Sequence, residues 1–237
     1  MCPQCGHVLP EYPDTDQILA ERGLTRATAA RGMCICSLLD QEQQRKDRAR
    51  WADADLPRGP VPKTFDNYDV YTEGLKEAFA AAQALVERSP PNILLLTSAV
   101  SGTGKSHLLE AIGRAELRAG NTVKYAYVPD LLDHLRSTYS PSSEEDLWEL
   151  LHGCRKVDTL LLDDLGQGNN SEWVQEKILA LVDERYRNGR RLAIASNLTA
   201  MELEREMGQR MASRLYDTTS GTVLVVHLKA VDYRVGE

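Results

Sequence analysis

A glycine-lysine-serine turn is the stretch whose residue types and spacing most directly suggest chemistry. Gly104, Lys105 and Ser106 follow an apolar run at 93–96 and precede apolar residues at helical spacing. In a G-x-x-x-x-G-K-S/T loop, backbone N–H groups surround phosphate oxygens, the lysine reaches the outer phosphates and the serine hydroxyl ligates Mg²⁺. The stretch therefore predicts a strand, a nucleotide phosphate loop and a helix.

The loop departs from this pattern at its first position, where Ala99 stands in place of glycine. Alanine adopts most glycine conformations as long as φ stays negative. A chance Gly-Lys-Ser sequence in a surface turn is the alternative, and the apolar run before the turn argues against it. We therefore expect a phosphate loop with negative φ at Ala99.

Two adjacent acids, Asp163 and Asp164, follow a second apolar run at 160–162. A short apolar run ending in acid is typical of a central parallel strand whose carboxyl end faces a nucleotide. There Asp163 would belong to the Mg²⁺ shell and Asp164 would polarise the attacking water. A helix cap is the alternative for an acidic pair alone, but the α/β pattern between Lys105 and the pair favours the nucleotide interpretation.

Three further polar residues are candidates for the same chemistry. Asn197 ends another apolar run and can orient the attacking water, although a turn residue is the simpler interpretation. Arg210 and Arg214 are four residues apart and share one helical face. Most arginines are solvated, yet in an oligomeric nucleotidase an arginine supplied across an interface stabilises charge on the transferring phosphoryl group.

The elements that must position these residues alternate between strands and helices, which predicts an α/β fold with a parallel sheet. Phe65 and Tyr68 precede the first helix and either lie near a nucleotide base or pack in the core. Cys154 is expected to be a buried thiol without chemistry. Strands are expected at 93–96, 122–128, 157–162, 190–197 and 222–228, and helices at 75–85, 131–135 with Asp130 as cap, 142–151 and 173–187.

The first sixty residues differ from the rest in composition. Two close cysteine pairs could complete a tetrahedral Zn²⁺ site, with His7 as a possible replacement for one thiolate. Two unrelated pairs of reduced cysteines are the alternative. A polar run at 37–54 predicts an exposed helix, and the proline-rich stretch at 57–62 predicts a linker, which divides the chain into 1–60 and 61–237. The proposed zinc ligands are Cys2, Cys5, Cys34 and Cys36.

Composition sets further limits on function. The chain has 237 residues, of which 42% are hydrophobic, and a formal net charge of −7. This balance disfavours a protein that coats duplex DNA, although a local basic groove is still allowed. We find neither an apolar run long enough to span a bilayer nor a basic-then-apolar signal at the N-terminus, so we expect a cytoplasmic protein with no membrane partner.

Taken together, these motifs resemble the DnaC/IstB-like AAA+ ATPases, a family that includes bacterial and phage replicative helicase loaders and transposition helper ATPases. The resemblance covers about residues 61–237 and implies a three-layer P-loop sandwich with a parallel central sheet and no helical lid, beside the small N-terminal zinc-binding and helical segment. The stretches that carry it are 64–68, 101–108, 162–166, 195–198, 213–215 and 232–234.

The resemblance also implies ligands and residue roles. ATP or ADP and Mg²⁺ would be bound, Asn197 would be the sensor residue, and Arg214 would be the finger that acts on a neighbouring subunit, with Arg210 a weaker candidate. Most AAA+ proteins have Glu where Asp164 stands, which leaves the hydrolysis rate open. The nucleotide-binding residues would be Ser101, Gly102, Thr103, Gly104, Lys105, Ser106, His107 and Asp163, with Ser106 and Asp163 at the Mg²⁺.

By the same resemblance, the chain would be an ATP-dependent loader of the replicative helicase hexamer onto single-stranded DNA. It would self-associate through its ATPase domains and grip the helicase with its N-terminal segment. Position alone suggests DNA contacts at Lys124, His134, Arg136 and Tyr139. The alternatives are a transposition helper ATPase and a nucleotide-gated adaptor that hydrolyses little ATP.

Overall fold

The computed structural model describes residues 15–21, 25, 36–137, 151–167 and 171–229. The chain forms two compact units, Met1–Ala52 and Asp53–Glu237. In the first unit, α1 spans Thr15–Glu21, and α3 spans Cys36–Asp53 and ends at the boundary between the units. The zinc prediction depends on Cys2, Cys5 and Cys34, which lie outside the described residues.

The second unit is organised around a five-stranded parallel sheet with the order β2-β3-β4-β1-β5. Every residue of the three central strands is buried, because helices cover both faces and leave no solvated side. The strands are β1 (Ile93–Thr97), β2 (Val123–Tyr127), β3 (Thr159–Asp163), β4 (Arg191–Ser196) and β5 (Val223–His227).

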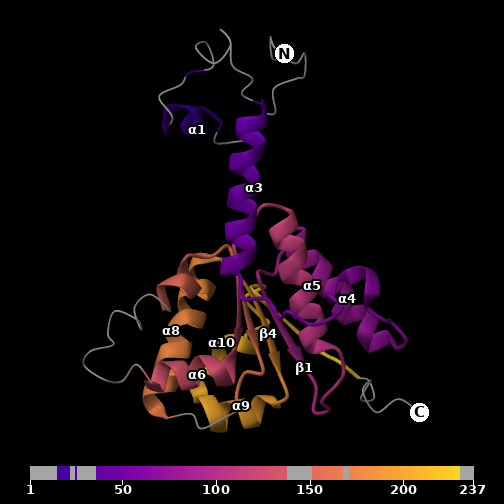
Figure 1. Ribbon diagram of the computed structural model, residues 1–237. Helices are drawn as coiled ribbons and strands as arrows, with labels where there is room; N and C mark the ends of the chain where they lie inside the picture. Colours follow the sequence, from indigo (N-terminus) through magenta and orange to yellow (C-terminus); the bar gives the residue numbers. More distant parts are fainter. Residues whose placement is uncertain (1–14, 22–24, 26–35, 138–150, 168–170, 230–237) are drawn as a thin grey trace. The chain divides into compact units, whose positions relative to one another are not determined.

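Helices complete a three-layer sandwich, which confirms the predicted fold class (Figure 1). Apolar faces of α4 (Glu73–Val86) and α5 (Lys105–Arg118) pack against one side of the sheet. The other side is covered by α6 (Val128–Ser137), α8 (Glu172–Asn188), α9 (Ala200–Met207) and α10 (Gln209–Leu215).

The proline-rich segment expected to be a linker lies against the ATPase unit. The carbonyl oxygen of Ala54 accepts a hydrogen bond of 2.8 Å from the backbone N–H of Tyr125, and that of Pro57 accepts one of 3.2 Å from Arg114. Further on, Lys63 N–H donates to Glu110. The segment therefore follows α5 toward the phosphate loop, and a short 3₁₀ helix at Phe65–Asn67 ends this path.

Some expected boundaries moved. The helix expected from residue 131 begins at Val128, so Asp130 lies within the first turn instead of capping it. Pro129 is tolerated there because first-turn N–H groups have no partner within the helix.

Cys154 is fully buried, as predicted. Most of the helix expected at 142–151 lies outside the described residues. None of the described helices is long and apolar enough to cross a membrane.

Candidate nucleotide site

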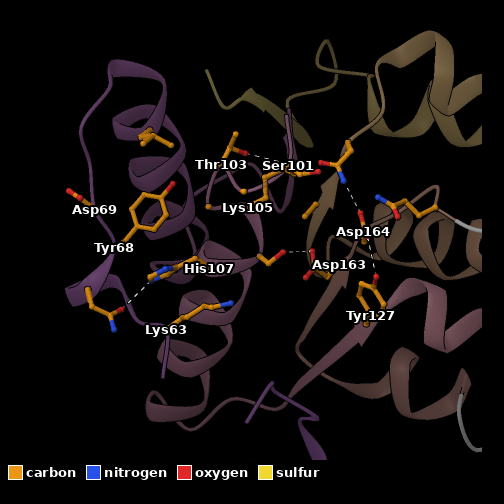
Figure 2. Close-up of a pocket in the computed structure, with 18 of the residues that line it drawn as sticks. Lys63, Tyr68, Asp69, Ser101, Thr103, Lys105, His107, Tyr127, Asp163 and Asp164 are labelled. Carbon is orange, nitrogen blue, oxygen red and sulfur yellow. Dashed lines mark hydrogen bonds between the residues drawn. The ribbon is translucent and has the colours of Figure 1, made fainter. Parts of the chain in front are cut away.

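A cavity of about 420 Å³ opens at the carboxyl ends of β1, β3 and β4. The phosphate loop and the segment before α4 form one wall, and the two acids stand on the other (Figure 2). Its lining includes every predicted nucleotide-binding residue, together with Asp164 and Asn197. The remaining lining residues are Lys63, Asn67, Tyr68, Asp69, Tyr71, Leu75, Tyr127, Gln167 and Ala195.

The phosphate loop has the backbone conformation that its glycines permit. Gly102 and Gly104 have φ of 73° and 93°, in the left-handed region where a side chain is disfavoured. A Cβ at Gly104 would also lie 2.9 Å from the ring of Tyr68. Ala99 is not among the described non-glycine residues with positive φ, so alanine fits at the first loop position.

Lys105 begins α5 and is 7% exposed. Its Nζ donates to the carbonyl oxygen of Val100 at 3.3 Å and to Thr103 Oγ1 at 3.4 Å. These contacts place the ammonium group inside the loop, where it can pair with the outer phosphates of a nucleotide at the N-terminus of α5.

Asp163 and Ser106 meet across the cavity floor. The Ser106 hydroxyl donates to Asp163 Oδ1 at 3.0 Å, and the Tyr125 hydroxyl donates to the other carboxylate oxygen. In the described part of the chain, no group of three or more His, Cys, Asp or Glu is placed to hold a metal. One hydroxyl and one carboxylate fit Mg²⁺, because this ion keeps several waters and takes its other ligands from substrate phosphates.

Asp164 lies just beyond β3 with φ of 62°, a conformation that Asp tolerates better than most residues. Asn197 Nδ2 donates to its Oδ1 at 2.9 Å, and the Tyr127 hydroxyl donates to its Oδ2 at 3.3 Å (Figure 2). Burial, and then the charge of Asp163, raise the pKa of the Asp164 carboxyl. The arrangement can hold a water molecule beside a carboxylate of increased basicity, the chemistry of a general base.

The two candidate finger arginines lie outside this cavity. Arg214, on α10, donates from Nε to Asp183 Oδ1 at 2.7 Å, and its guanidinium lies over the Tyr186 ring at 5.0 Å from the centroid. Arg210 is on the same helix and is exposed. Neither is among the lining residues of this chain's own pocket, so their predicted role concerns a second subunit.

Aromatic residues near the loop have different positions. Tyr68 lines the cavity, whereas Phe65 packs edge-on against the Phe79 ring at 5.5 Å between centroids. His107 also lines the cavity, but its Nε2 lies 3.0 Å from the carbonyl oxygen of Thr64 and 3.1 Å from Asn67 Oδ1. Its imidazole thus contacts the segment before α4, and burial lowers its pKa.

Sequence reasoning missed Tyr125 and Tyr127, whose hydroxyls contact the two acids. Alternation along the strand at 122–128 could have indicated that both face the same way, but not which acids they meet. The DNA contact suggested for Lys124 by position alone stays a prediction. Lys124 Nζ lies 2.6 Å from Asp55 Oδ2 and donates to the carbonyl oxygen of Asp53, which holds it at the edge of the sheet.

Known proteins with similar sequences and folds agree with the motif resemblance. Residues 23–237 match the IstB-like ATP binding proteins. The replicative helicase loader DnaC of Buchnera aphidicola subsp. Acyrthosiphon pisum is 30% identical over 153 residues, 64% of this chain and 62% of that protein. The chain thus spans under two thirds of that relative. DnaC of Escherichia coli K12 is 28% identical over 221 residues, 89% of this chain and 84% of that protein.

A solved structure supports the same assignment. Domain III of the replication initiation protein DnaA from Thermotoga maritima superposes with a TM-score of 0.62 and 28% identity, and covers 74% of this chain and 70% of that one. The family match is longer than the whole sheet-containing unit and includes the phosphate loop, both acids and Asn197. The protein therefore belongs to the IstB-like ATP binding proteins, within the DnaC/IstB-like AAA+ ATPases.

Proposed function

We propose that the protein is an ATP-dependent loader that places a replicative DNA helicase on single-stranded DNA. The observation that carries this proposal is the similarity to the helicase loader DnaC over 89% of the chain. A match of that extent is longer than the unit Asp53–Glu237 and therefore includes part of the first unit. The similarity thus extends beyond the ATPase core to the segment to which we assign helicase binding.

The pocket supports ATP hydrolysis as the step that resets the loader. Lys105 would neutralise the outer phosphates, and Ser106 with Asp163 would hold Mg²⁺, which would supply further positive charge to the phosphates. Asp164 would accept a proton from the attacking water, which Asn197 orients. Because Asp is one methylene shorter than the usual Glu, we expect slow turnover.

A second subunit would complete the site. Arg214 would approach the γ-phosphate of a neighbouring chain and stabilise charge in the transition state, as arginine fingers do. The Arg214 side chain is 40% exposed and that of its present partner Asp183 is 15% exposed, so the guanidinium lies at the surface, where exchange of one ion pair for another costs little. Self-association through the ATPase units is part of this proposal.

The N-terminal segment would bind the helicase and hold one Zn²⁺ through Cys2, Cys5, Cys34 and Cys36. The test is metal analysis of the purified chain together with co-purification of the cognate helicase by the full chain and by a chain starting at Asp53. Zinc well below one per chain would refute the metal site. Undiminished helicase binding by the shortened chain would refute the gripping role.

Helicase loading itself is tested by unwinding of a fork whose single strand is coated with single-strand-binding protein. We expect the parent to stimulate the cognate helicase and Lys105→Ala to retain less than about a tenth of that stimulation, since the phosphate-binding charge is lost. The control Lys76→Ala removes an exposed lysine from α4 and should behave as the parent. Equal stimulation by all three chains would refute an ATP-dependent loader.

A transposition helper ATPase is the second candidate, because the chain matches the IstB-like family. That function requires duplex DNA, so ATP turnover stimulated by duplex and not by single strands would favour it. Turnover that neither DNA stimulates, equal in the parent and in Lys105→Ala, would favour the nucleotide-gated adaptor.

A further inference from the structure

Both carboxylate oxygens of Asp163 accept hydrogen bonds, and only one comes from the phosphate loop. Ser106 Oγ lies 3.0 Å from Oδ1, and the hydroxyl of Tyr125 donates to Oδ2. Tyr125 lies opposite Leu161 in the parallel register of β2 and β3. Since side chains on one face of a strand repeat every second residue, Leu161, Asp163 and Tyr125 share a face of the sheet.

Tyr125 is held in place from two directions. Its side chain is 8% exposed within the apolar cluster between the sheet and α5, and its backbone N–H donates to the carbonyl oxygen of Ala54 at 2.8 Å. Lys124, the preceding residue, is tied to Asp55 by an ion pair of 2.6 Å. The hydroxyl of Tyr125 therefore points at Asp163 because its ring and its strand are both fixed.

A phenol in this position has a defined chemical effect. It donates a single hydrogen bond and cannot compete as a strong Mg²⁺ ligand, so it fixes the carboxylate plane through Oδ2 and leaves Oδ1 directed toward Ser106. Partners of this kind orient metal ligands, and their loss typically lowers metal affinity about 10–100-fold.

We propose that Tyr125 is a positioning residue for Mg²⁺, acting through Asp163, an inference that rests on the proposed use of Mg²⁺ and ATP in this pocket. The simpler interpretation is that Tyr125 only packs in the core, and that its hydrogen bond to Asp163 has no effect on metal binding. The two differ in what removal of the hydroxyl changes. A positioning role affects the metal, and a packing role affects stability or the whole pocket.

The experiment uses the full chain and a fluorescent ATP analogue, titrated once in EDTA and once with increasing Mg²⁺. Tyr125→Phe keeps the ring and removes the hydroxyl, so affinity in EDTA should stay within about twofold of the parent. The Mg²⁺ concentration that gives half of the fluorescence change should rise about tenfold. In an Asp163→Asn background, Tyr125→Phe should cause no further change, because the metal-binding carboxylate through which the hydroxyl would act is gone.

Tyr127 supplies a matched control on the same strand. Its hydroxyl lies 3.3 Å from Asp164 Oδ2 instead of contacting Asp163, so Tyr127→Phe should leave the Mg²⁺ midpoint within about twofold of the parent. An unchanged midpoint in Tyr125→Phe, or an equal shift in both variants, would overturn the proposal. So would equal weakening with and without Mg²⁺.

Two further readouts separate the remaining outcomes. If the parent binds the analogue in neither condition, the ATP-dependent function fails, whereas normal Mg²⁺ dependence in Tyr125→Phe defeats only this inference. If Tyr125→Phe does not fold, the parent labelled with 3-fluorotyrosine gives the answer. Its Tyr125 signal, assigned by substituting the other tyrosines in turn, should shift when Mg²⁺ is added to the nucleotide complex, and a signal that stays in place would overturn the proposal.

Discussion

Charged side chains have opposite surroundings at the two ends of the sheet. At the amino end, Arg185 is 1% exposed and donates to the carbonyl oxygens of Cys154, Val157 and Arg191 at 2.7 to 2.9 Å. At the carboxyl end, Asp163 and Asp164 are adjacent, and Asp164 has φ of 62°. At the amino end, backbone carbonyl oxygens of the fold surround the buried charge. At the carboxyl end, two like charges lie next to each other in the nucleotide pocket.

This difference indicates where stability is given up for function. Arg191 and Glu116, also at the amino end, form a buried ion pair of 2.9 Å. Buried polar atoms without a hydrogen-bond partner among the described residues occur at both ends, for example Arg185 Nε and Asn197 Oδ1. The pocket differs by its adjacent carboxylates and by the positive φ of Asp164. Strained backbone of this kind gathers at functional sites. Substitutions at the carboxyl end should therefore affect activity, and substitutions at the amino end should affect stability.

Asp164→Asn should have the largest effect, and this effect should be on catalysis alone and not on stability. Loss of the general base should lower phosphate release about 10³-fold, while the free energy of unfolding in urea stays constant or increases because repulsion from Asp163 is removed. The control Glu77→Gln changes an exposed acid of α4 and should alter neither quantity. A marked loss of stability in Asp164→Asn would remove the distinction between the two ends.

Arg185→Leu tests the amino end. Three buried carbonyl oxygens would lose their donor, at about 1 kcal/mol or more each, so the free energy of unfolding should fall by about 3 kcal/mol. Affinity for nucleotide, measured where the variant is folded, should stay close to that of the parent. Arg187→Leu, on the exposed face of the same helix, should cost less than about 0.5 kcal/mol. Equal losses in the two variants would contradict the structural role of Arg185.

The sequence also predicts some residues and contacts of the two ends better than others. Apolar runs ending in acid or amide predicted β3 and β4, and the carboxyl ends of parallel strands meet at one edge, so Asp163, Asp164 and Asn197 could be placed together. The partners of Tyr125 could not be predicted, because they depend on β2 lying beside β3, a long-range pairing. The ion pair of Lys124 with Asp55 could not be predicted either, because it joins residues that are far apart in the sequence.

Other contacts could not be predicted from composition. Within the proline-rich stretch at 57–62, Pro57 accepts a hydrogen bond from Arg114 of α5, and just before it Ala54 accepts one from Tyr125 of β2, which sequence pattern does not encode. Arg185 was unremarkable within a helix of mixed charge, and only the fold shows that the guanidinium is enclosed by carbonyl groups.

Glu116→Gln should have an intermediate effect at the amino end. Arg191 would keep its charge in a site that is 8% exposed but lose its counterion, while the amide could retain one hydrogen bond. We expect a loss of about 2 kcal/mol in the free energy of unfolding and an unchanged rate of phosphate release per folded molecule. A fall in turnover without a change in stability would show that the amino end also acts in catalysis.

The smallest effect concerns pH. Burial and Asp163 raise the pKa of Asp164, so its carboxylate form is lost, and turnover with it, as pH falls through a value above the ordinary Asp range. The same raised pKa means that ionised Asp164 costs stability, a cost that appears as pH rises through the folded-state value and that is absent below the unfolded one.

Hydrogen bonds from Asn197 and Tyr127 oppose the raised pKa of Asp164. Asn197→Ala, which removes one of them, should therefore move the acid limb of the turnover profile to higher pH. Asn121→Ala removes an amide that bonds Glu116 at the amino end and should leave the limb in place. A shift in both variants would mean that the two ends are electrostatically coupled, because the side-chain hydrogen bonds of Asn121 within the described residues join it to Glu116 and Arg88 at the amino end.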